Sequence, residues 1–234
     1  MSDTRHLIFD FFGTLVTYPN SFIGLHDHND SYNLLKGAGL SLSYNNFIEF
    51  FVATRQQLEA WGRVNLREYS MTELVDQFCD QYMPTNIDST LKQAFLDAYL
   101  KEWSTSVHHS KDVADMMHRL HEHYTLSVIS NCHHKPLVMH HLKVLGIAHL
   151  LEDVLTSVET GYRKPHPDIF ATALNRLGVR AEECLFVGDS YLPDYLGPSD
   201  AGITSWLIDP ERRHDIPDEH RLTGVLDAGV RLLQ

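Results

Sequence analysis

The sequence predicts an α/β protein with a parallel β-sheet, interrupted after its first strand by a helical insertion. From about residue 105 onward, short apolar runs alternate with stretches of helical periodicity. The segment from about residue 18 to residue 104 has mostly helical periodicity. It is far too long to be an ordinary crossover between the first strand and the second. We therefore expect one domain made of residues 1–17 and 105–234, and a helical domain made of residues 18–104.

Five apolar runs predict the strands of the sheet. The first, residues 6–10, ends at Asp10 and precedes a turn in which Gly13 can adopt positive φ. The later runs cover residues 126–129, 154–156, 185–187 and 203–208. Helical stretches lie between or beside them, over residues 116–123, 136–145, 167–177 and 194–201. Such alternation predicts a parallel sheet covered on both faces, and the polar residues 209–221 predict a surface loop before a short final element.

Apolar residues at helical spacing predict four helices in the insertion, over residues 34–40, 46–61, 71–82 and 89–103. Ser70 and Glu73 have the spacing of a capping box just before one of these stretches. Residues 86–89, Asn-Ile-Asp-Ser, give another helix start signal. The insertion is therefore expected to form a helical bundle.

Composition excludes several classes of protein. The chain has 234 residues, and 31 acidic against 19 Lys and Arg residues give a net charge of −12, which argues against a general nucleic-acid binder. No apolar run approaches the roughly 20 residues that span a bilayer, and the N-terminus lacks the pattern of a signal peptide. Neither the three cysteines nor the 16 histidines have the spacing of a zinc site. We expect a cytoplasmic protein that acts on a small molecule, away from membranes, and the sequence does not indicate its oligomeric state.

Four short motifs carry the candidate chemistry. In chain order they are Asp10-Phe11-Phe12-Gly13-Thr14-Leu15-Val16; Ser130-Asn131; Lys164 within Arg163-Lys164-Pro165-His166-Pro167-Asp168; and Gly188-Asp189-Ser190 followed by Asp194. The first, second and fourth each stand at the predicted end of a strand, and ligands gather at this edge of parallel sheets. Together the four motifs resemble those of the haloacid dehalogenase superfamily of aspartate-nucleophile hydrolases.

The resemblance covers the whole predicted core and implies a Rossmann-like sheet with the helical insertion as a cap over the site. It implies that Asp10 is the nucleophile and that Mg²⁺ is held by Asp10, Asp189 and the backbone carbonyl of Phe12. It further implies that Ser130, Asn131 and Lys164 hold a phosphoryl group. Asp194 would orient Lys164 or a water molecule on the metal.

Elementary chemistry agrees with these roles. A carboxylate is ionised near neutral pH and can attack a phosphorus atom that is held in line with it. Attack by an anion on an anionic phosphate needs nearby positive charge, which a net acidic protein must supply locally. Mg²⁺ prefers hard oxygen ligands, and Lys164 is a compact cation suited to phosphate.

Phe12 departs from the resemblance, because the family's general acid/base, an aspartate, belongs at this position. A phenyl ring cannot transfer a proton, and loss of acid/base help typically costs about 10²–10⁴-fold in rate. Three explanations stay open. The leaving group needs no protonation, as with an acyl phosphate; or a histidine (His26, His28, His133 or His134) takes over; or the substrate is not a phosphate.

The last explanation points to the branch of the family that removes halide from 2-haloacids, which also has an aromatic residue here and uses no metal. Two features weigh against it: Asp189 is intact, and no arginine lies between Arg5 and Arg55 to bind the substrate carboxylate. The phosphonate-cleaving branch would need Lys36, the only early lysine of the insertion, for a Schiff base. We predict a Mg²⁺-dependent phosphatase of a small phosphorylated metabolite. The alternatives are a metal-independent 2-haloacid dehalogenase and a weakly active member that binds a phosphorylated ligand.

Overall fold

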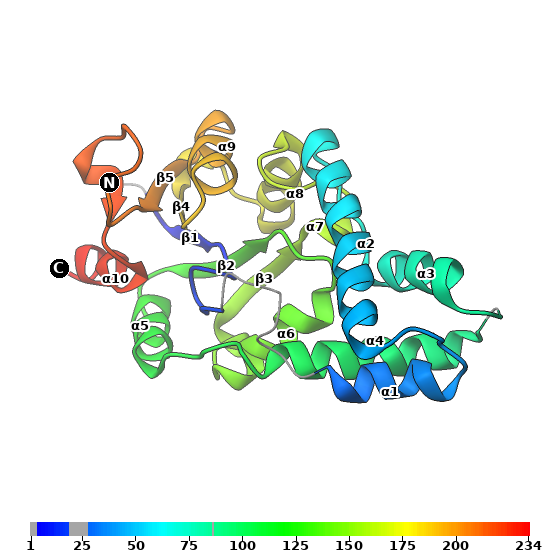
Figure 1. Ribbon diagram of the computed structural model, residues 1–234. Helices are drawn as coiled ribbons and strands as arrows, with labels where there is room; N and C mark the ends of the chain where they lie inside the picture. Colours follow the sequence, from blue (N-terminus) through cyan, green and yellow to red (C-terminus); the bar gives the residue numbers. More distant parts are fainter. Residues whose placement is uncertain (1–3, 19–27, 86) are drawn as a thin grey trace. The chain divides into compact units, whose positions relative to one another are not determined.

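The computed structural model describes residues 4–18, 28–85 and 87–234. The chain divides into two compact units (Figure 1). Residues 1–17 and 108–234 form the first, which we call the core unit, and residues 18–107 form the second, the helical unit.

A parallel sheet forms the centre of the core unit, as the sequence predicts. Its strands, in the described residues, follow the order β3-β2-β1-β4-β5-β6, and each neighbouring pair is parallel. Their bounds are β1 (His6–Phe9), β2 (Thr125–Ser130), β3 (Leu151–Thr156), β4 (Cys184–Gly188), β5 (Thr204–Ile208) and β6 (Arg221–Leu222). The order reverses at β1, and in open α/β sheets such a reversal is where ligands bind.

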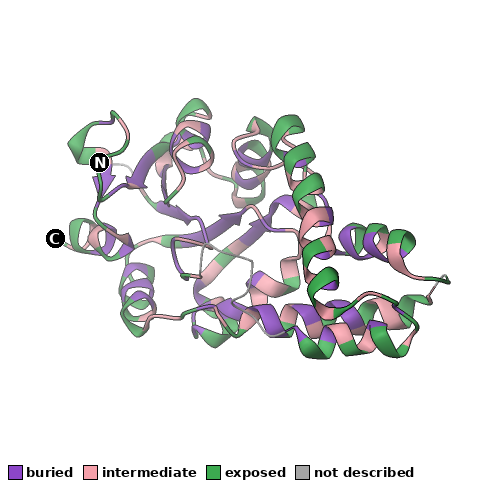
Figure 2. Ribbon diagram, viewed as in Figure 1, coloured by how far each residue is buried: buried purple, intermediate pink, exposed green. Residues whose placement is uncertain are grey.

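Helices cover both faces of this sheet. Figure 1 shows α8 and α9 on one face and α5 and α10 on the other, and the strands between them are largely buried (Figure 2). The helices of the core unit are α5 (Lys111–His121), α6 (Lys135–Val144), α7 (Ser157–Thr160), α8 (Pro167–Leu177), α9 (Gly197–Asp200) and α10 (Val225–Leu232). Short 3₁₀ turns are η1 (Ala148–Leu150), η2 (Ala181–Glu183) and η4 (Asp218–His220), and η3 (Tyr191–Leu196) is a π-helix.

One part of the core shows how the apolar runs hold these layers together. Ile8 of β1, Ile129 of β2 and Phe186 of β4 share a buried cluster with Ile169 and Phe170 of α8. Burying such side chains contributes about 1.5–3 kcal/mol each. This packing fixes the three strand ends whose following residues form the candidate site.

The helical unit has its own apolar core. Its helices are α1 (Asn29–Gly37), α2 (Tyr44–Asn65), α3 (Met71–Tyr82) and α4 (Ser89–Ser104). Phe47 and Phe51 of α2, Phe78 of α3 and Phe95 of α4 are buried in one cluster, in which Phe47 lies 5.7 Å from Phe78 and 6.1 Å from Phe95 between ring centroids. The capping box predicted at Ser70 and Glu73 is present, and Asp88 caps α4 through the backbone N–H of Leu91 at 2.8 Å.

Helix α1 begins five residues earlier than the predicted stretch 34–40, for a reason that local sequence does not show. The carboxylate of Glu102, from α4, accepts hydrogen bonds from the backbone N–H of Asp30 at 2.6 Å and from the Ser31 hydroxyl at 2.6 Å. It therefore satisfies donors of the first helical turn that would otherwise be unpaired. At the other end, Gly39 at φ +104° ends the helix before residue 40.

The expected surface loop over residues 209–221 is wrong in part. Asp209 is 4% exposed and Arg221 8% exposed, and their side chains form an ion pair. Arg221 also starts β6, which pairs with β5 at the sheet edge. Asp209 and Arg221 are thus paired with each other inside the fold, which hydropathy alone cannot distinguish from exposure, whereas Glu211, Arg212, Arg213 and Asp218 are exposed as expected.

In the part of the chain that the structure describes, no helix is both long and apolar enough to cross a membrane.

Candidate active site

Asp10 lies at the carboxyl end of the central strand. Its backbone N–H donates to the carbonyl of Val187 at 2.9 Å, so it continues the pairing of β1 with β4. On the other side of β1, Phe9 is in register with Val128 of β2. Asp10 is therefore fixed between the ends of β2 and β4, with 6% of its surface exposed.

Lys164 pairs with Asp10 inside the core unit. Its Nζ donates to Asp10 Oδ1 at 2.7 Å and to the backbone carbonyl of Ile129 at 2.8 Å, and it lies 2.7 Å from Asp194 Oδ1. The Lys164 side chain is 1% exposed. The ammonium thus makes two hydrogen bonds and one ion pair, so the charge is held at one point beside the nucleophile.

Asn131 holds the backbone of Lys164 by two hydrogen bonds. Its Oδ1 accepts from the Lys164 N–H at 2.8 Å, and its Nδ2 donates to the Lys164 carbonyl at 2.9 Å. The Asn131 side chain therefore positions Lys164, and only the backbone N–H of Asn131 is left to serve the predicted phosphoryl-binding role.

Ser130 ends β2, and its hydroxyl is buried with no hydrogen-bond partner within the described residues. Such a hydroxyl suits a group that bonds a ligand.

Asp189 and Asp194 complete the cluster. Carboxylate oxygens of Asp10, Asp189 and Asp194 lie within 4.8 Å of one another. Asp194 Oδ2 accepts from the backbone N–H of Ser190 at 3.0 Å, which ties the π-helix η3 to the end of β4.

Two glycines allow this close packing. A Cβ on Gly13, which has φ +97°, would lie 2.5 Å from Asp189 Oδ2. A Cβ on Gly188 would overlap the Asp194 side chain. Both motifs therefore need glycine, because Asp189 lies against the turn after β1 and Asp194 lies against the end of β4 without space for a further side chain.

The cluster carries more negative than positive charge. Burial and the neighbouring carboxylates of Asp194 and Asp189 raise the pKa of Asp10 to about 7, although Lys164 lowers it. Burial and the charge of Asp194 raise the pKa of Asp189 to about 6. The pKa of Lys164 is also raised: burial opposes its charge, but Asp10 and Asp194 outweigh that effect.

These residues fit a divalent cation. Three hard-oxygen side chains converge, the raised pKa values of Asp10 and Asp189 show that like charges are poorly compensated, and such donors suit Mg²⁺. Asp10 and Asp189 are the ligands that the sequence predicts, and Asp194 joins them in this cluster. The part assigned to the Phe12 carbonyl stays a prediction.

The Phe12 side chain packs against other rings. Its centroid lies 4.9 Å from Phe11 and 6.2 Å from His141, both edge to face. His141 is fully buried, and its Nδ1 is 3.1 Å from Nε2 of His109. Burial lowers the pKa of His141 to about 4. His141 is not among the candidate histidines predicted from the sequence, although its spacing from the apolar residues Val138 and Leu142 places it on the buried face of α6.

The other candidate histidines have different surroundings. His28 is 6% exposed, stacks on Tyr99 at 5.0 Å and lies 3.4 Å from Glu102, all within the helical unit. His133 and His134 are half-buried in the turn between β2 and α6. His26 lies outside the described residues.

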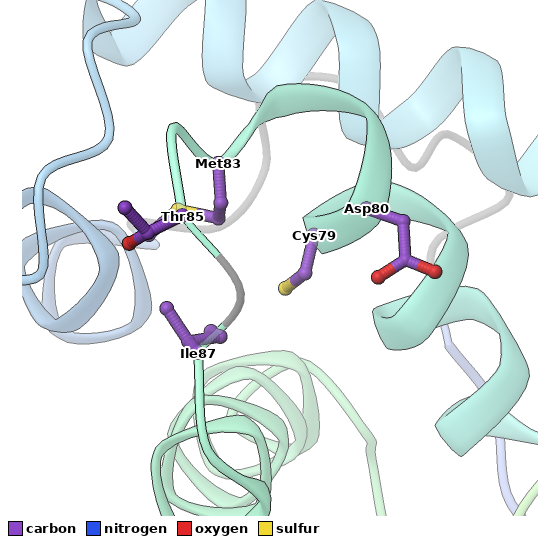
Figure 3. Close-up of a pocket in the computed structure, with 5 residues that line it drawn as sticks. All are labelled: Cys79, Asp80, Met83, Thr85 and Ile87. Carbon is purple, nitrogen blue, oxygen red and sulfur yellow. The ribbon is translucent and has the colours of Figure 1, made fainter.

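A separate pocket of about 190 Å³ lies in the helical unit (Figure 3). It is lined by Cys79, Asp80, Met83, Thr85 and Ile87. Burial raises the pKa of the Cys79 thiol to about 11. A thiol in this state is a poor nucleophile, so the pocket offers no second catalytic centre of this kind.

Comparison with known proteins adds to this geometry. A family model described as haloacid dehalogenase-like hydrolase matches residues 45–208, which is more than half of the chain. The matched range contains Ser130, Asn131, Lys164, Asp189 and Asp194 and leaves out Asp10 and Phe12.

Several curated relatives are named phosphatases, among them the following two. Over 67 residues the chain is 40% identical to the glyceraldehyde 3-phosphate phosphatase of Methanothermobacter thermautotrophicus, covering 29% of this chain and 30% of the relative. Over 125 residues it is 32% identical to the ribulose-1,5-bisphosphate 5-phosphatase of Halopiger xanaduensis, covering 53% of this chain and 51% of the relative. The chain thus spans about a third to a half of the length of these relatives.

A solved structure shares the fold over the whole chain. The 2-haloacid dehalogenase of Pseudomonas syringae pv. Tomato DC3000 superposes with a TM-score of 0.67 at 18% identity, covering 99% of this chain and 100% of that one. At this identity the likeness concerns the fold alone.

Proposed function

Because this chain belongs to the haloacid dehalogenase-like hydrolases, we propose that it is a Mg²⁺-dependent phosphatase that transfers the phosphoryl group of a small substrate to Asp10. The observation that carries this proposal is the convergence of Asp10, Asp189 and Asp194 around one buried lysine. The names of the two curated relatives support a phosphorylated metabolite as the substrate class.

Each residue has a role that follows from its contacts. Asp10 Oδ1 is held by Lys164 at 2.7 Å, so rotation of the carboxylate is restricted and its other oxygen is the one we assign to the attack on phosphorus. The Ser130 hydroxyl, which has no partner in the described chain, and the N–H of Asn131 would bond the phosphoryl oxygens. Hydrogen bonds of this kind, pre-formed before the reaction, are worth the most in a site shielded from water.

Asp194 positions Lys164 rather than touching the substrate. It is 2% exposed and is held by the Ser190 N–H and by the Lys164 ammonium. Asp10 and Asp189 would hold Mg²⁺, which when bound offsets the charge of the phosphoryl oxygens and keeps the carboxylates ionised. We further propose that the helical unit acts as the cap that selects the substrate.

The alternative is a metal-independent dehalogenase, and the aromatic residue at Phe12 is the observation that supports it. Three converging carboxylates favour the phosphatase, because without a bound cation their negative charges would repel one another beside the nucleophile. A single panel separates the two: phosphate esters and acyl phosphates with Mg²⁺ or EDTA, and 2-chloropropionate in EDTA.

Phosphate release that requires Mg²⁺ is the expected result, and Asp10→Asn should abolish it while circular dichroism shows an intact fold. Halide release in EDTA would establish the dehalogenase instead. Binding of Mg²⁺ with no turnover of any compound would indicate that the protein binds a ligand and is not an enzyme for these substrates. Unchanged turnover in Asp10→Asn would remove this residue from the mechanism.

A further inference from the structure

The departure of the leaving group depends on its basicity. An alkyl phosphate ester releases an alkoxide, whose conjugate acid has a pKa of about 16, close to that of water. An acyl phosphate releases a carboxylate, whose conjugate acid has a pKa of about 4. The first needs a proton donor beside the leaving oxygen, and the second does not.

The lysine beside Asp10 already has three close partners. Its ammonium is hydrogen-bonded to Asp10 Oδ1 and to the Ile129 carbonyl and ion-paired with Asp194 Oδ1, each within 2.8 Å. A proton given up by this ammonium would leave two buried carboxylates without their counter-charge. Lys164 is therefore a fixed cation and a poor acid.

The carboxylates of the cluster are no better as proton donors. Asp194 is 2% exposed and bonded to Lys164 and to the Ser190 N–H. Asp189 is the exposed member of the cluster, and the proposed function uses its carboxylate as a ligand of Mg²⁺. Over the described residues of the core unit, the charges that act on Asp10 are those of Lys164, Asp194 and Asp189.

Phe12 and its neighbours do not restore a donor. The Phe12 ring packs edge to face on Phe11 and His141. The His141 ring is fully buried, and its Nδ1 is hydrogen-bonded to His109. This imidazole contacts the phenyl ring and has no exposed surface.

From these contacts we propose that the substrates of this site carry their phosphoryl group on a weakly basic leaving group, and that acyl phosphates are the preferred class. The inference rests on the proposed phosphatase function. In the first step an Asp10 carboxylate oxygen forms a bond to phosphorus, and the bond from phosphorus to the acyl oxygen breaks. The electron pair leaves with the carboxylate, and no proton is transferred. Water then attacks phosphorus, and the bond from phosphorus to Asp10 breaks with its electron pair returning to the carboxylate. One proton of the water stays on the new phosphate oxygen and the other passes to solvent.

A series of leaving groups tests this proposal on the unaltered protein. The value of kcat/KM is measured with Mg²⁺ for substituted aryl phosphates of graded leaving-group pKa, for acetyl phosphate and for glyceraldehyde 3-phosphate. We expect a steep fall of kcat/KM as leaving-group pKa rises, with acetyl phosphate exceeding glyceraldehyde 3-phosphate by about 100-fold or more, the size of a missing acid. Equal rates for the two, or a flat dependence, would overturn the substrate class and leave the phosphatase intact.

Two variants sharpen the result. Phe12→Asp keeps the backbone carbonyl and adds a carboxyl group, and should raise kcat/KM for glyceraldehyde 3-phosphate by about tenfold or more. His133→Asn should leave the slope of the series unchanged; a selective loss on the basic leaving groups would identify His133 as the acid and contradict the proposal. No turnover of any phosphate would defeat the proposed function itself, and with it this inference.

Discussion

Asp10 and Asp189 hold protons more tightly than ordinary carboxyl groups do. Their pKa values, about 7 and about 6, are raised because burial and the neighbouring carboxylates disfavour their ionised forms. Cation binding requires the ionised forms. Protons and Mg²⁺ therefore compete for the same oxygens.

We predict that Mg²⁺ binds more weakly as pH falls. Between about pH 8 and pH 6 the two carboxyl groups become partly protonated in the metal-free protein, so affinity should drop by about tenfold or more. Isothermal calorimetry in buffers of different ionisation enthalpy measures both the affinity and the protons released. Affinity that is constant over this range, with no proton release, would show that these groups are not the ligands.

Single residues differ in how well the sequence predicts them. Asp10, Lys164 and Asp189 stand in recognisable motifs, and their side chains do converge. The sequence does not show that the Asn131 side chain is used to hold the Lys164 backbone, because that pairing joins residues 33 positions apart. The burial of His141 against Phe12 is hidden for the same reason.

At the scale of the element, the turn after β1 is shaped by Gly13. Its φ of +97° is unfavourable for other residues, and its missing Cβ leaves room for the Asp189 carboxylate. Gly146 has φ +78°, but a Cβ there would meet nothing within 4 Å. The two glycines thus share a backbone conformation and differ in their surroundings.

Gly13→Ala should therefore lower kcat/KM by about 100-fold, because a displaced Asp189 misplaces the reacting groups. Gly146→Ala should lower the free energy of unfolding by about 1–2 kcal/mol, the cost of a left-handed conformation for a residue with a Cβ, with activity preserved. Steady-state kinetics and urea unfolding of both variants make the comparison. Equal loss of activity in the two would mean that strain, rather than the approach to Asp189, explains the effect.

Elements with strong local signals are predictable, and those made by distant contacts are less so. Helix α8 has the predicted bounds, since a proline begins it and Gly178 in a left-handed conformation ends it. The predicted helical stretch 194–201 is divided between the end of the π-helix η3 and α9, and the edge strand β6 was not predicted. Helix η3 is tied to Lys164 through Asp194, and β6 depends on pairing with β5, so neither is defined by a local pattern alone.

At the scale of the molecule, each unit has its own apolar core. Alternating runs and helices were sufficient to predict the parallel sheet, because its buried strands are continuous apolar segments. Helical periodicity was sufficient to predict the helices of the other unit, because their aromatic residues recur on one face. Periodicity gives no information about which side chains of separate elements meet.

The aromatic core of the helical unit should account for much of its stability. Phe47 is fully buried and contacts Phe51, Phe78 and Phe95. Phe47→Ala should lower the free energy of unfolding by about 3–5 kcal/mol. Val64→Ala on the same helix, at a side chain 83% exposed, should change it by less than about 0.5 kcal/mol. Urea unfolding checks both, and a small loss for Phe47→Ala would mean that this core is not tightly packed.

Detection of the covalent intermediate tests most directly whether Asp10 is the nucleophile. The protein is mixed with Mg²⁺ and acetyl phosphate, quenched in acid during turnover and digested, and the peptides are analysed by mass spectrometry. We predict a phosphoryl group on Asp10, absent from Asp10→Asn. Steady turnover with no phosphorylated peptide, or with the phosphoryl group on another residue such as His133, would contradict it.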